Sequence, residues 1–387
     1  MRIAYLAYTD LKRQGAPKIH VSAIVEGLAD LGHKITLVVP AGFGGIEHRN
    51  VRVVEIAQKP MISILWARKV AKWLYDNAGE LDVVYERDFY NSASIARNTV
   101  RANIPFVLEM NGSLKAEKSV SSEKSRYKLW NSLDLHFSVK KRLKLADRVI
   151  CVAPGLIEEY APMTGDREKF VFHPNGVDTE IFCPVENKDV LREKIELSLF
   201  KPLLGAVGSI LPYHVDSPVI PAMEILAERY PQIGLVFVGG GPGKENLMAV
   251  AKASSVRDKI HFRGPVSTEE SAKYIAALDV ALAWSTEETA VGTWPVRLSA
   301  YSSCGIPIVG PNWGTYLTFE SAGVLKASAG ANPKSIADAV SEIIENPEIS
   351  AEMSRAGRKF AVENLSWKSI VDKTEKLLYG VVNNSKN

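Results

Sequence analysis

Short apolar runs alternate with segments of helical periodicity along the whole chain. In the first half the apolar runs lie at residues 2–8, 34–40, 81–86, 105–110, 148–153 and 169–174. Such near-continuous runs are typical of strands that are buried on both faces. Residues 20–33 carry apolar side chains at the spacing of an amphipathic helix, which Gly32 closes. Strand, helix and strand repeated in this way predict a parallel sheet with helices on both faces.

A second series of the same kind begins after the charged stretch at residues 185–202. Strands are predicted at 203–209, 233–241, 259–264, 280–285 and 306–310, and helices at 219–230, 244–254, 268–279 and 295–304. An amphipathic segment at 369–382 closes the chain. The fold class is therefore α/β, with two Rossmann-like doubly wound domains that face each other across a cleft. We expect domains at 1–185 and 186–366, with a helix at 367–383 that packs back onto the first.

Composition and charge narrow the classes of function. The chain has 387 residues and a net charge of +3, which gives no general reason to expect nucleic-acid binding. Three cysteines without C-x-x-C spacing predict no disulfide framework and fit a reducing compartment. No apolar run is long enough to span a bilayer, so we expect a cytoplasmic protein that is at most peripheral at the inner face of the plasma membrane.

Several familiar motifs are absent from the sequence. There is no G-x-G-x-x-G after the first predicted strand and no G-x-S-x-G, and residues 239–244 do not fit a phosphate-binding P-loop. No His/Cys cluster or HExxH predicts a metal site.

Polar loops at the carboxyl ends of the predicted strands are the remaining candidates. Gly15 and Ala16 lead into a helix whose N-terminus suits an anionic or hydroxylated ligand, although a plain strand–helix turn is equally consistent. Later strands end at Glu86, Arg87, Glu109 and Asn111, where polar side chains suit sugar hydroxyls. In the second half the loops are GSILPYHVD, VGGGPG, HFRGPV and STEETAVGTW.

These segments, in this order, resemble the GT-B glycosyltransferases, and among them the retaining enzymes of family 4. The resemblance covers nearly the whole chain and rests on FHPNGVDTEIFCP, VGGGPGKENL, YSSCGIPIVG and LSWKSIVDKTEKLLYG. It implies transfer of a sugar from a nucleotide-diphosphate donor to a saccharide or lipid-linked acceptor in cell-envelope or polysaccharide assembly. It also implies retention of the anomeric configuration, and neither a metal nor a cofactor.

The resemblance assigns residues to three roles. Asn111 and Glu288 are expected at the transferred sugar. Donor binding is expected at Gly208, Ser209, His214, Gly240, Gly241, Arg263, Gly292, Thr293, Trp294 and Arg297. Acceptor binding is expected at Gly15, Ala16, Lys18, Glu86 and Arg87.

The sequence departs from the family at its charged donor positions. The diphosphate-binding Arg and Lys fall on Ser209 and His214, where a histidine is a weaker, pH-dependent cation. The E-x7-E pair falls on Gly292 and Ala300, with Glu287 or Glu288 as a replacement for its first member. Arg297, one helical turn before Ala300, can return a positive charge to the diphosphate.

Besides a catalytic enzyme of this family, two other functions stay open, and the sequence also suggests a membrane surface as a partner. The chain is a catalytic glycosyltransferase, or it is a non-catalytic GT-B subunit or carbohydrate-binding protein; a sugar-nucleotide epimerase is a more distant alternative. Residues 61–77 and 128–144 combine tryptophans with cations at helical spacing. They predict docking to an anionic membrane surface, unless the aromatic side chains belong to the core.

Overall fold

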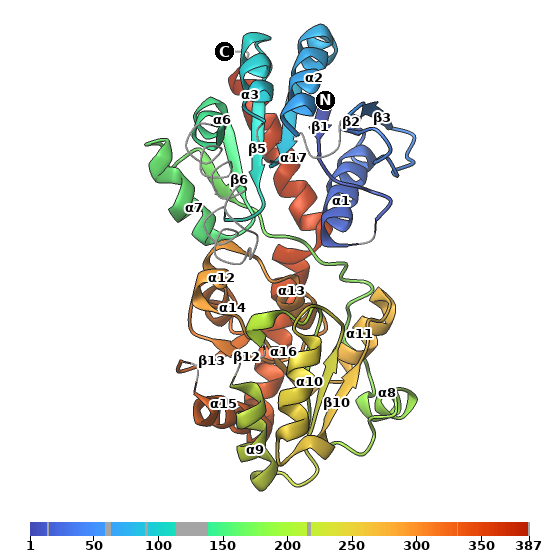
Figure 1. The fold of residues 1–387 in the computed structure, drawn as a ribbon, viewed down its shortest axis with the longest axis vertical. Coiled ribbons are helices and arrows are strands. Elements are labelled where there is room, and N and C mark those ends of the chain that lie inside the picture. Colours follow the sequence, from blue (N-terminus) through green and yellow to red (C-terminus); the bar gives the residue numbers. More distant parts are fainter. Residues whose placement is uncertain are drawn as a thin grey trace. The chain divides into compact units, whose positions relative to one another are not determined.

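The structure of the chain is a computed structural model, and it describes residues 1–13, 15–58, 63–89, 92–113, 138–214, 218–330 and 332–385. By their contacts the residues form two units (Figure 1). The first unit contains Met1–Asn175, Gly292–Trp294 and Trp367–Asn387, and the second contains Gly176–Val291 and Pro295–Ser366. The chain thus first passes from the first unit to the second after Asn175, whereas the sequence predicted the domain boundary after residue 185.

The first unit is built on a parallel sheet of order β3-β2-β1-β4-β5-β6-β7. Its strands are β1 (Arg2–Leu6), β2 (Lys34–Pro40), β3 (Val51–Ile56), β4 (Val83–Arg87), β5 (Phe106–Met110), β6 (Arg148–Cys151) and β7 (Phe170–Phe172). Its helices are α1 (Ala16–Asp30), α2 (Ser63–Asp76), α3 (Ala93–Arg101), α6 (Lys140–Leu145), α7 (Pro154–Tyr160) and α17 (Trp367–Asn384). The strand β3, an edge strand that is only half-buried, was not predicted from the sequence.

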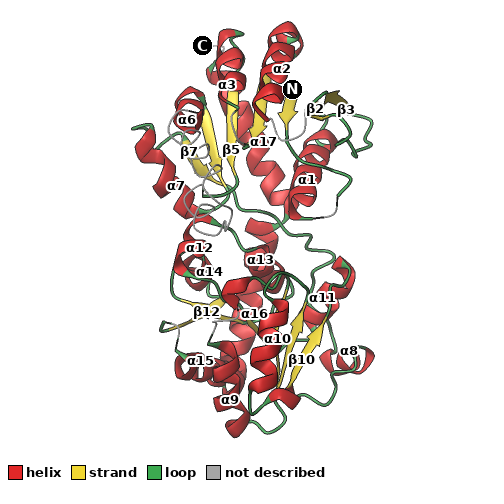
Figure 2. Cartoon of the chain, in the orientation of Figure 1, coloured by secondary structure: helices red, strands yellow, loops and turns green. Residues whose placement is uncertain are grey.

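Two hydrophobic cores lie on the two faces of this sheet. One core contains side chains from α1 and α17, among them Val25 and Leu378. The other contains side chains from α2, α3, α6 and α7, among them Trp66 and Leu143. Figure 2 shows these strands enclosed by helices, as the near-continuous apolar runs of the sequence predicted.

The second unit is built on a parallel sheet of order β10-β9-β8-β11-β12-β13. Its strands are β8 (Leu203–Val207), β9 (Gly234–Val238), β10 (Ile260–Arg263), β11 (Val280–Leu282), β12 (Ile308–Pro311) and β13 (Leu325–Ser328). Its helices are α8 (Lys188–Lys194), α9 (Val219–Arg229), α10 (Lys244–Ala253), α11 (Thr268–Ala276), α12 (Glu287–Gly292), α13 (Val296–Ser303), α14 (Tyr316–Ser321), α15 (Pro333–Glu345) and α16 (Pro347–Phe360). The α/β class with two doubly wound sheets is therefore confirmed.

Local sequence signals account for several helix ends. Gly32 (φ 90°) follows α1, and the amide of His33 bonds to the carbonyl of Leu28 there. Ser267 and Glu270 form a reciprocal capping box at the start of α11. In each sheet the order of the strands reverses once, between β1 and β4 and between β8 and β11. Ligands of such sheets bind outside the carboxyl ends of the strands at that point.

Candidate functional site

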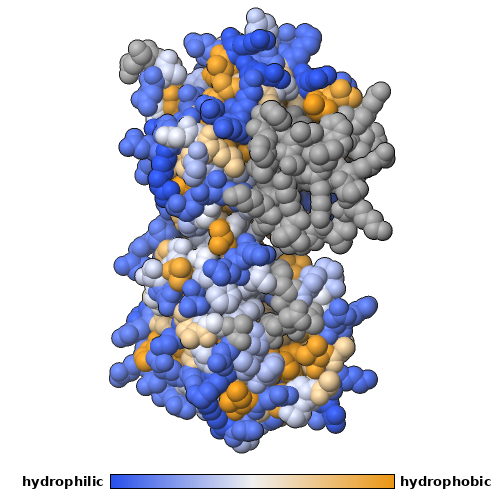
Figure 3. All heavy atoms as spheres, turned by 60° about the vertical axis from the view of Figure 1, so that its left-hand side comes forward, coloured by the Kyte–Doolittle hydropathy of each residue, from blue (hydrophilic) through white to orange (hydrophobic). Residues whose placement is uncertain are grey.

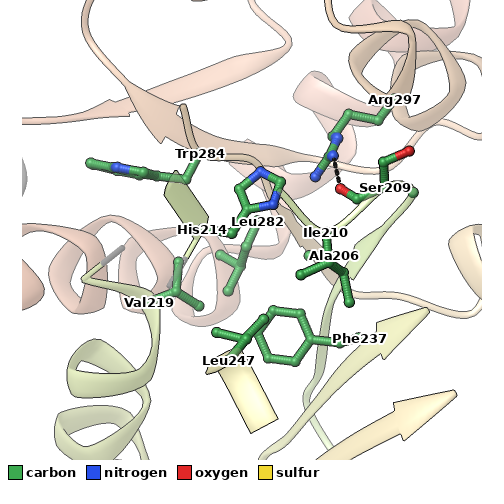
Figure 4. A pocket seen from close by; sticks show the side chains of 11 residues that line it. Ala206, Ser209, Ile210, His214, Val219, Phe237, Leu247, Leu282, Trp284 and Arg297 are labelled. Carbon is green, nitrogen blue, oxygen red and sulfur yellow. Dashed lines mark hydrogen bonds between the residues drawn. The ribbon is translucent and has the colours of Figure 1, made fainter. Parts of the chain in front are cut away.

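A small pocket lies where the strand order of the second unit reverses, at the carboxyl ends of β8 and β11 (Figure 4). Its volume is about 20 Å³, which is room for about one water molecule. The lining residues are Ala206, Gly208, Ser209, Ile210, His214, Val219, Phe237, Leu247, Leu282, Trp284 and Arg297. The walls are thus mostly apolar, and the polar groups lie along the loop that follows β8 and on α13.

Arg297 lies over the loop that follows β8. Its Nη2 donates a 2.6 Å hydrogen bond to the carbonyl oxygen of Ser209, as Figure 4 shows. Gly208 has φ 130°, and a Cβ at this position would lie 3.6 Å from the guanidinium carbon. The structure therefore brings Gly208, Ser209 and Arg297 together, and the fixed charge of Arg297 covers the end of β8.

The helix α13 is fastened to β8 through a buried tyrosine. The hydroxyl of Tyr301 accepts a 2.8 Å hydrogen bond from the amide of Val207 and donates a 3.1 Å bond to its carbonyl. Tyr301 lies one turn after Arg297 and is fully buried. Ala300 is also buried, so the position next to Tyr301 presents no charge. The hydrogen bonds of Tyr301 thus fix the position of α13, and with it the position of Arg297 over the loop after β8.

His214 is part of the scaffold of this pocket. Its Nδ1 accepts a 2.9 Å hydrogen bond from the amide of Leu211, and the side chain is buried. Burial, followed by the charge of Arg297, lowers the pKa of His214 to about 3, against the effect of a hydrogen bond to the backbone of Trp284. The ring is therefore neutral near pH 7, which corrects the expectation of a pH-dependent cation at this position.

The glycine-rich loop after β9 packs against the loop after β8. A Cβ at Gly239 would lie 2.1 Å from the carbonyl oxygen of Gly208, and one at Gly241 would lie 2.3 Å from that of Ile210. The carbonyl of Gly240 accepts a 2.9 Å hydrogen bond from the amide of Ile210. These glycines thus allow the loop after β9 to lie against the loop after β8, rather than against a ligand. The contact fixes the shape of the loop that lies beneath Arg297.

The polar segment before α13 contains Glu288, which was predicted at the transferred sugar, and three of the predicted donor-binding residues. Glu288 is exposed in the first turn of α12, and Gly292 ends that helix. Thr293 is half-buried and Trp294 is buried at 4% exposure. None of these four residues lines the pocket of Arg297.

Arg263 lies outside the pocket of Arg297. It is the last residue of β10, and its Nη2 donates a 3.0 Å bond to Glu196 in a separate pocket. The two pockets share no lining residue.

In the first unit the predicted residues lie at the carboxyl end of the sheet. Gly15 caps the exposed start of α1, which contains Ala16 and the half-buried Lys18. Asn111 follows β5 and is half-buried, and its side-chain nitrogen lies 3.4 Å from the carbonyl oxygen of Glu109. Arg87 ends β4, and its Nε lies 3.8 Å from the carboxylate of Glu109.

Glu109, which the sequence offered as a polar residue for sugar hydroxyls, is instead the centre of a buried polar group, and its partners His20 and Tyr85 were not foreseen. The Nε2 of His20, on α1, lies 2.9 Å from one carboxylate oxygen and 3.0 Å from the other, and the hydroxyl of Tyr85 donates to the second. Burial raises the pKa of Glu109, but His20, Arg87 and Tyr85 together lower it to about 2. Glu109 is therefore a carboxylate at every ordinary pH, although it is 1% exposed. His20 is 89 positions and Tyr85 is 24 positions from Glu109 along the chain, so no local motif signals these contacts.

Glu86 points to the other side of the sheet and is fully buried. It accepts hydrogen bonds from Ser92 and from Arg142, whose Nη1 lies 3.2 Å away. Burial raises the pKa of Glu86 to about 7, although the charge of Arg142 opposes the shift. The expectation that Glu86 is presented to an acceptor is corrected here, because the chain itself encloses the carboxylate.

The described part of the chain contains no group of three or more His, Cys, Asp or Glu side chains that could hold a metal ion. No helix among the described residues is long and apolar enough to cross a bilayer.

Comparison with family models covers most of the chain. The family described as Glycosyl transferases group 1 matches residues 187–360, and the one described as Glycosyltransferase Family 4 matches residues 18–181. The two matched stretches correspond closely to the two doubly wound sheets.

Comparison with curated proteins finds relatives of moderate similarity. The GDP-mannose-dependent alpha-(1-6)-phosphatidylinositol monomannoside mannosyltransferase of Mycolicibacterium smegmatis is 28% identical over 272 residues, which are 68% of this chain and 71% of the relative. The D-inositol 3-phosphate glycosyltransferase of Nocardiopsis dassonvillei is 29% identical over 244 residues, which are 59% of this chain and 55% of the relative.

Comparison with solved structures shows the same architecture. The crystal structure of Anabaena HepE in complex with UDP superposes with a TM-score of 0.72 at 18% identity, and the match covers 98% of this chain and 100% of that one. At this identity the similarity establishes the fold alone.

Proposed function

Because the chain belongs to the GT-B glycosyltransferases, with a family 4 first half and a group 1 second half, we propose that it transfers a sugar from a nucleotide-diphosphate donor with retention of configuration. The acceptor in this proposal is a saccharide or a lipid-linked saccharide of the cell envelope. A transferase is supported by both family matches and by the names of the relatives. The donor, the acceptor and the stereochemistry are parts of the proposal.

The contact of Arg297 with the loop after β8 carries this proposal. Of the described residues that line the pocket, Arg297 alone has a permanent charge, and it lies where the strand order reverses. A guanidinium has five N–H groups, and the bond to Ser209 uses one of them, which leaves others for phosphate oxygens. The pocket itself has room for only about one water molecule, so we propose that the diphosphate of the donor binds at its mouth, against the guanidinium of Arg297.

Arg297 also provides the charge stabilisation that the transfer requires. As the glycosidic bond to the donor breaks, negative charge develops on the leaving diphosphate, and a fixed cation beside it lowers the barrier. No metal ion and no cofactor enters this proposal. Since His214 is neutral, the whole positive charge of this pocket depends on Arg297.

The burial of Ala300 favours the alternative function, a non-catalytic GT-B subunit or a carbohydrate-binding protein. The buried position one turn after Arg297 has no carboxylate for a donor ribose, and each lost bond to a charged group costs about 1.5–3 kcal/mol. A thermal-shift panel of UDP-, GDP-, ADP- and TDP-sugars separates the two functions. A donor raises the melting temperature of the catalytic protein, because a ligand of the folded state stabilises it. A flat response across the panel at millimolar concentration would favour the non-catalytic alternative.

We also propose that an anionic membrane surface brings the chain to a lipid-linked acceptor. The helix α3 packs against both α2 and α6, and these three helices carry a set of exposed cations that we call the basic face. These cations are Arg68, Lys69, Lys72, Arg97, Arg101, Lys140, Lys141 and Lys144. Neither α3 nor α6 contains an acidic residue. The Mycolicibacterium smegmatis relative is named for a phosphatidylinositol acceptor, which supports a lipid-linked acceptor here.

The docking we propose is electrostatic, and it differs in part from the expectation from sequence. Trp66 is 0% exposed and belongs to the core, and Arg142 is buried against Glu86. Ile62, Trp130 and Phe137 lie outside the described residues. On the face drawn in Figure 3 the coloured surface is mostly hydrophilic, with hydrophobic residues in small separate groups.

Vesicle sedimentation tests the basic face. The protein is expected to sediment with vesicles that contain phosphatidylglycerol at low salt and to be released at high salt, because each cation near the surface contributes about 1 kcal/mol. A triple variant is expected to lose sedimentation; it combines Lys140→Glu, Lys141→Glu and Lys144→Glu. The control Lys252→Glu, in the second unit, leaves sedimentation unchanged. Equal binding to neutral and anionic vesicles would contradict an electrostatic surface.

A further inference from the structure

A second pocket in the second unit lies between α8, β10 and α11 and is much larger than the pocket of Arg297. Its volume is about 370 Å³, within the range of small-molecule sites. Its polar lining consists of Lys194, Glu196, Arg263, Glu270, Lys273 and Tyr274.

The alternation of β10 explains why Arg263 faces this pocket. Ile260 belongs to the core of the unit and Phe262 packs against the same core, so the even-numbered side chains of the strand lie on the core face. His261 contacts the ring of Phe200, and Arg263 follows it on the opposite face. The register of one strand thus turns Arg263 away from the core.

Three cations converge on the pocket, and most of their hydrogen-bonding capacity is unused. Arg263 donates one bond, from Nη2 to Glu196 at 3.0 Å, out of the five that a guanidinium has. Lys194 and Lys273 form no ion pair with any carboxylate of the described residues, and both are exposed. An anion bound in the pocket would therefore meet the forked guanidinium of Arg263 and two ammonium groups.

Glu196 has a strained backbone at the edge of this pocket. It follows the C-terminus of α8 with φ 61°, and the amide of Leu197 bonds to the carbonyl of Arg192 at 2.8 Å in the manner of a Schellman motif. Glycine is the residue that this position ordinarily takes, because a Cβ is disfavoured at such a φ. The glutamate therefore costs stability, and its carboxylate contacts Arg263. Strained residues of this kind are concentrated at binding sites.

We propose that this pocket binds a small phosphate monoester that carries hydroxyl groups, such as a sugar phosphate or a polyol phosphate. The phosphate contacts Arg263, Lys194 and Lys273, and the hydroxyls donate to the carboxylates of Glu196 and Glu270. The pocket shares no lining residue with that of Arg297, so the site goes beyond the proposed function and is separate from donor binding.

Isothermal titration of the 387-residue chain tests the site with three probes: glucose 6-phosphate, inorganic phosphate and glucose. Glucose 6-phosphate is expected to bind, inorganic phosphate to bind at least tenfold more weakly, and glucose not to bind. The double variant Lys194→Ala/Lys273→Ala lowers the affinity for glucose 6-phosphate by about tenfold or more, because two bonds to a charged acceptor are lost. Lys252→Ala, an exposed lysine on α10, leaves the affinity unchanged.

Four outcomes would overturn the proposal. The first is the absence of any binding heat with glucose 6-phosphate at about 10 mM, the weakest binding of interest. The second is an unchanged affinity in the double lysine variant, and the third is an equal affinity for inorganic phosphate. The fourth is a loss of affinity in Arg297→Ala equal to that in the lysine variant. The last would place the ligand in the other pocket. Nucleoside-diphosphate binding in the double lysine variant is expected to be that of the native chain, so failure here and failure of the proposed function are distinguishable.

Discussion

The guanidinium of Arg297 is held against the carbonyl oxygen of Ser209 at 2.6 Å, across the backbone of Gly208. The two residues are 88 positions apart along the chain, and they meet because α13 is fastened to the end of β8. This contact places a half-buried cation at the strand reversal of the second unit.

Arg297→Ala is expected to weaken the binding of a nucleoside diphosphate by about 10- to 150-fold, because a charge-assisted hydrogen bond worth about 1.5–3 kcal/mol is lost. Arg297→Lys recovers part of the affinity, since an ammonium keeps the charge without the fork. Isothermal titration measures both variants, with the exposed Arg257→Ala as the matched control. Full affinity in Arg297→Ala would remove this residue from the donor site.

Tyr301→Phe is expected to destabilise the second unit by about 1–3 kcal/mol, because the buried amide and carbonyl of Val207 each lose a partner. Urea unfolding measures the loss, and the exposed Tyr75→Phe controls for removal of a hydroxyl as such. Donor affinity falls as well, since α13 holds Arg297. A variant as stable as the native chain would show that the hydroxyl does not fasten α13.

The pH dependence of stability is expected to contain a contribution from His214. Burial lowers the pKa of His214 to about 3, from an ordinary value of 6.5, so the unfolded chain binds the proton more readily between these values. The contribution is complete above about pH 6.5 and is lost as the pH falls from there towards 3.

The variant His214→Gln removes this contribution while keeping a polar side chain. Its unfolding free energy is expected to fall less steeply between pH 6.5 and 4 than that of the native chain, as urea titrations at several pH values would measure. Parallel curves for the two proteins would mean that His214 is not buried in the neutral form.

The glycines of the loop after β9 are expected to resist any side chain. Gly239→Ala and Gly241→Ala each place a Cβ within 2.1–2.3 Å of a carbonyl oxygen at a positive φ, which costs about 1–3 kcal/mol or more. Gly264→Ala, where a Cβ meets no atom within 4 Å, is the control and stays near neutral. Thermal unfolding compares the three. Equal stability of all three variants would show that the two loops are not in contact.

Glu196→Gly is expected to stabilise the chain by about 1 kcal/mol, because glycine relieves the left-handed backbone. The ion pair with Arg263 is largely exposed and offsets little of this gain. Glu193→Gly, inside α8, is the opposite control and destabilises by about 1 kcal/mol. The order of melting temperatures is therefore Glu196→Gly above the native chain and Glu193→Gly below it, and a reversed order would exclude backbone strain at Glu196.

The sequence determined the architecture of the chain because hydrophobic periodicity is a local property. Apolar runs such as residues 34–40 and 106–110 give buried parallel strands, and the spacing of Val21 to Leu28 gives α1. The resemblance to family 4 placed Gly208, Ser209 and Arg297 among the donor residues, and the structure brings these three together at the end of β8. The strand β3 was missed, since its half-exposed residues carry no such run.

Only the tertiary structure decided the state of the charged and polar groups. The sequence does not indicate that His214 is neutral, that Glu86 is enclosed by Ser92 and Arg142, or that Arg263 faces another pocket than Arg297 does. A side chain's charge and direction depend on burial and on partners that are distant along the chain, such as His20 for Glu109. Periodicity in the sequence indicates which face of a helix or strand is apolar. The charge state of a group in a site depends on the side chains and backbone groups that lie next to it in the folded chain.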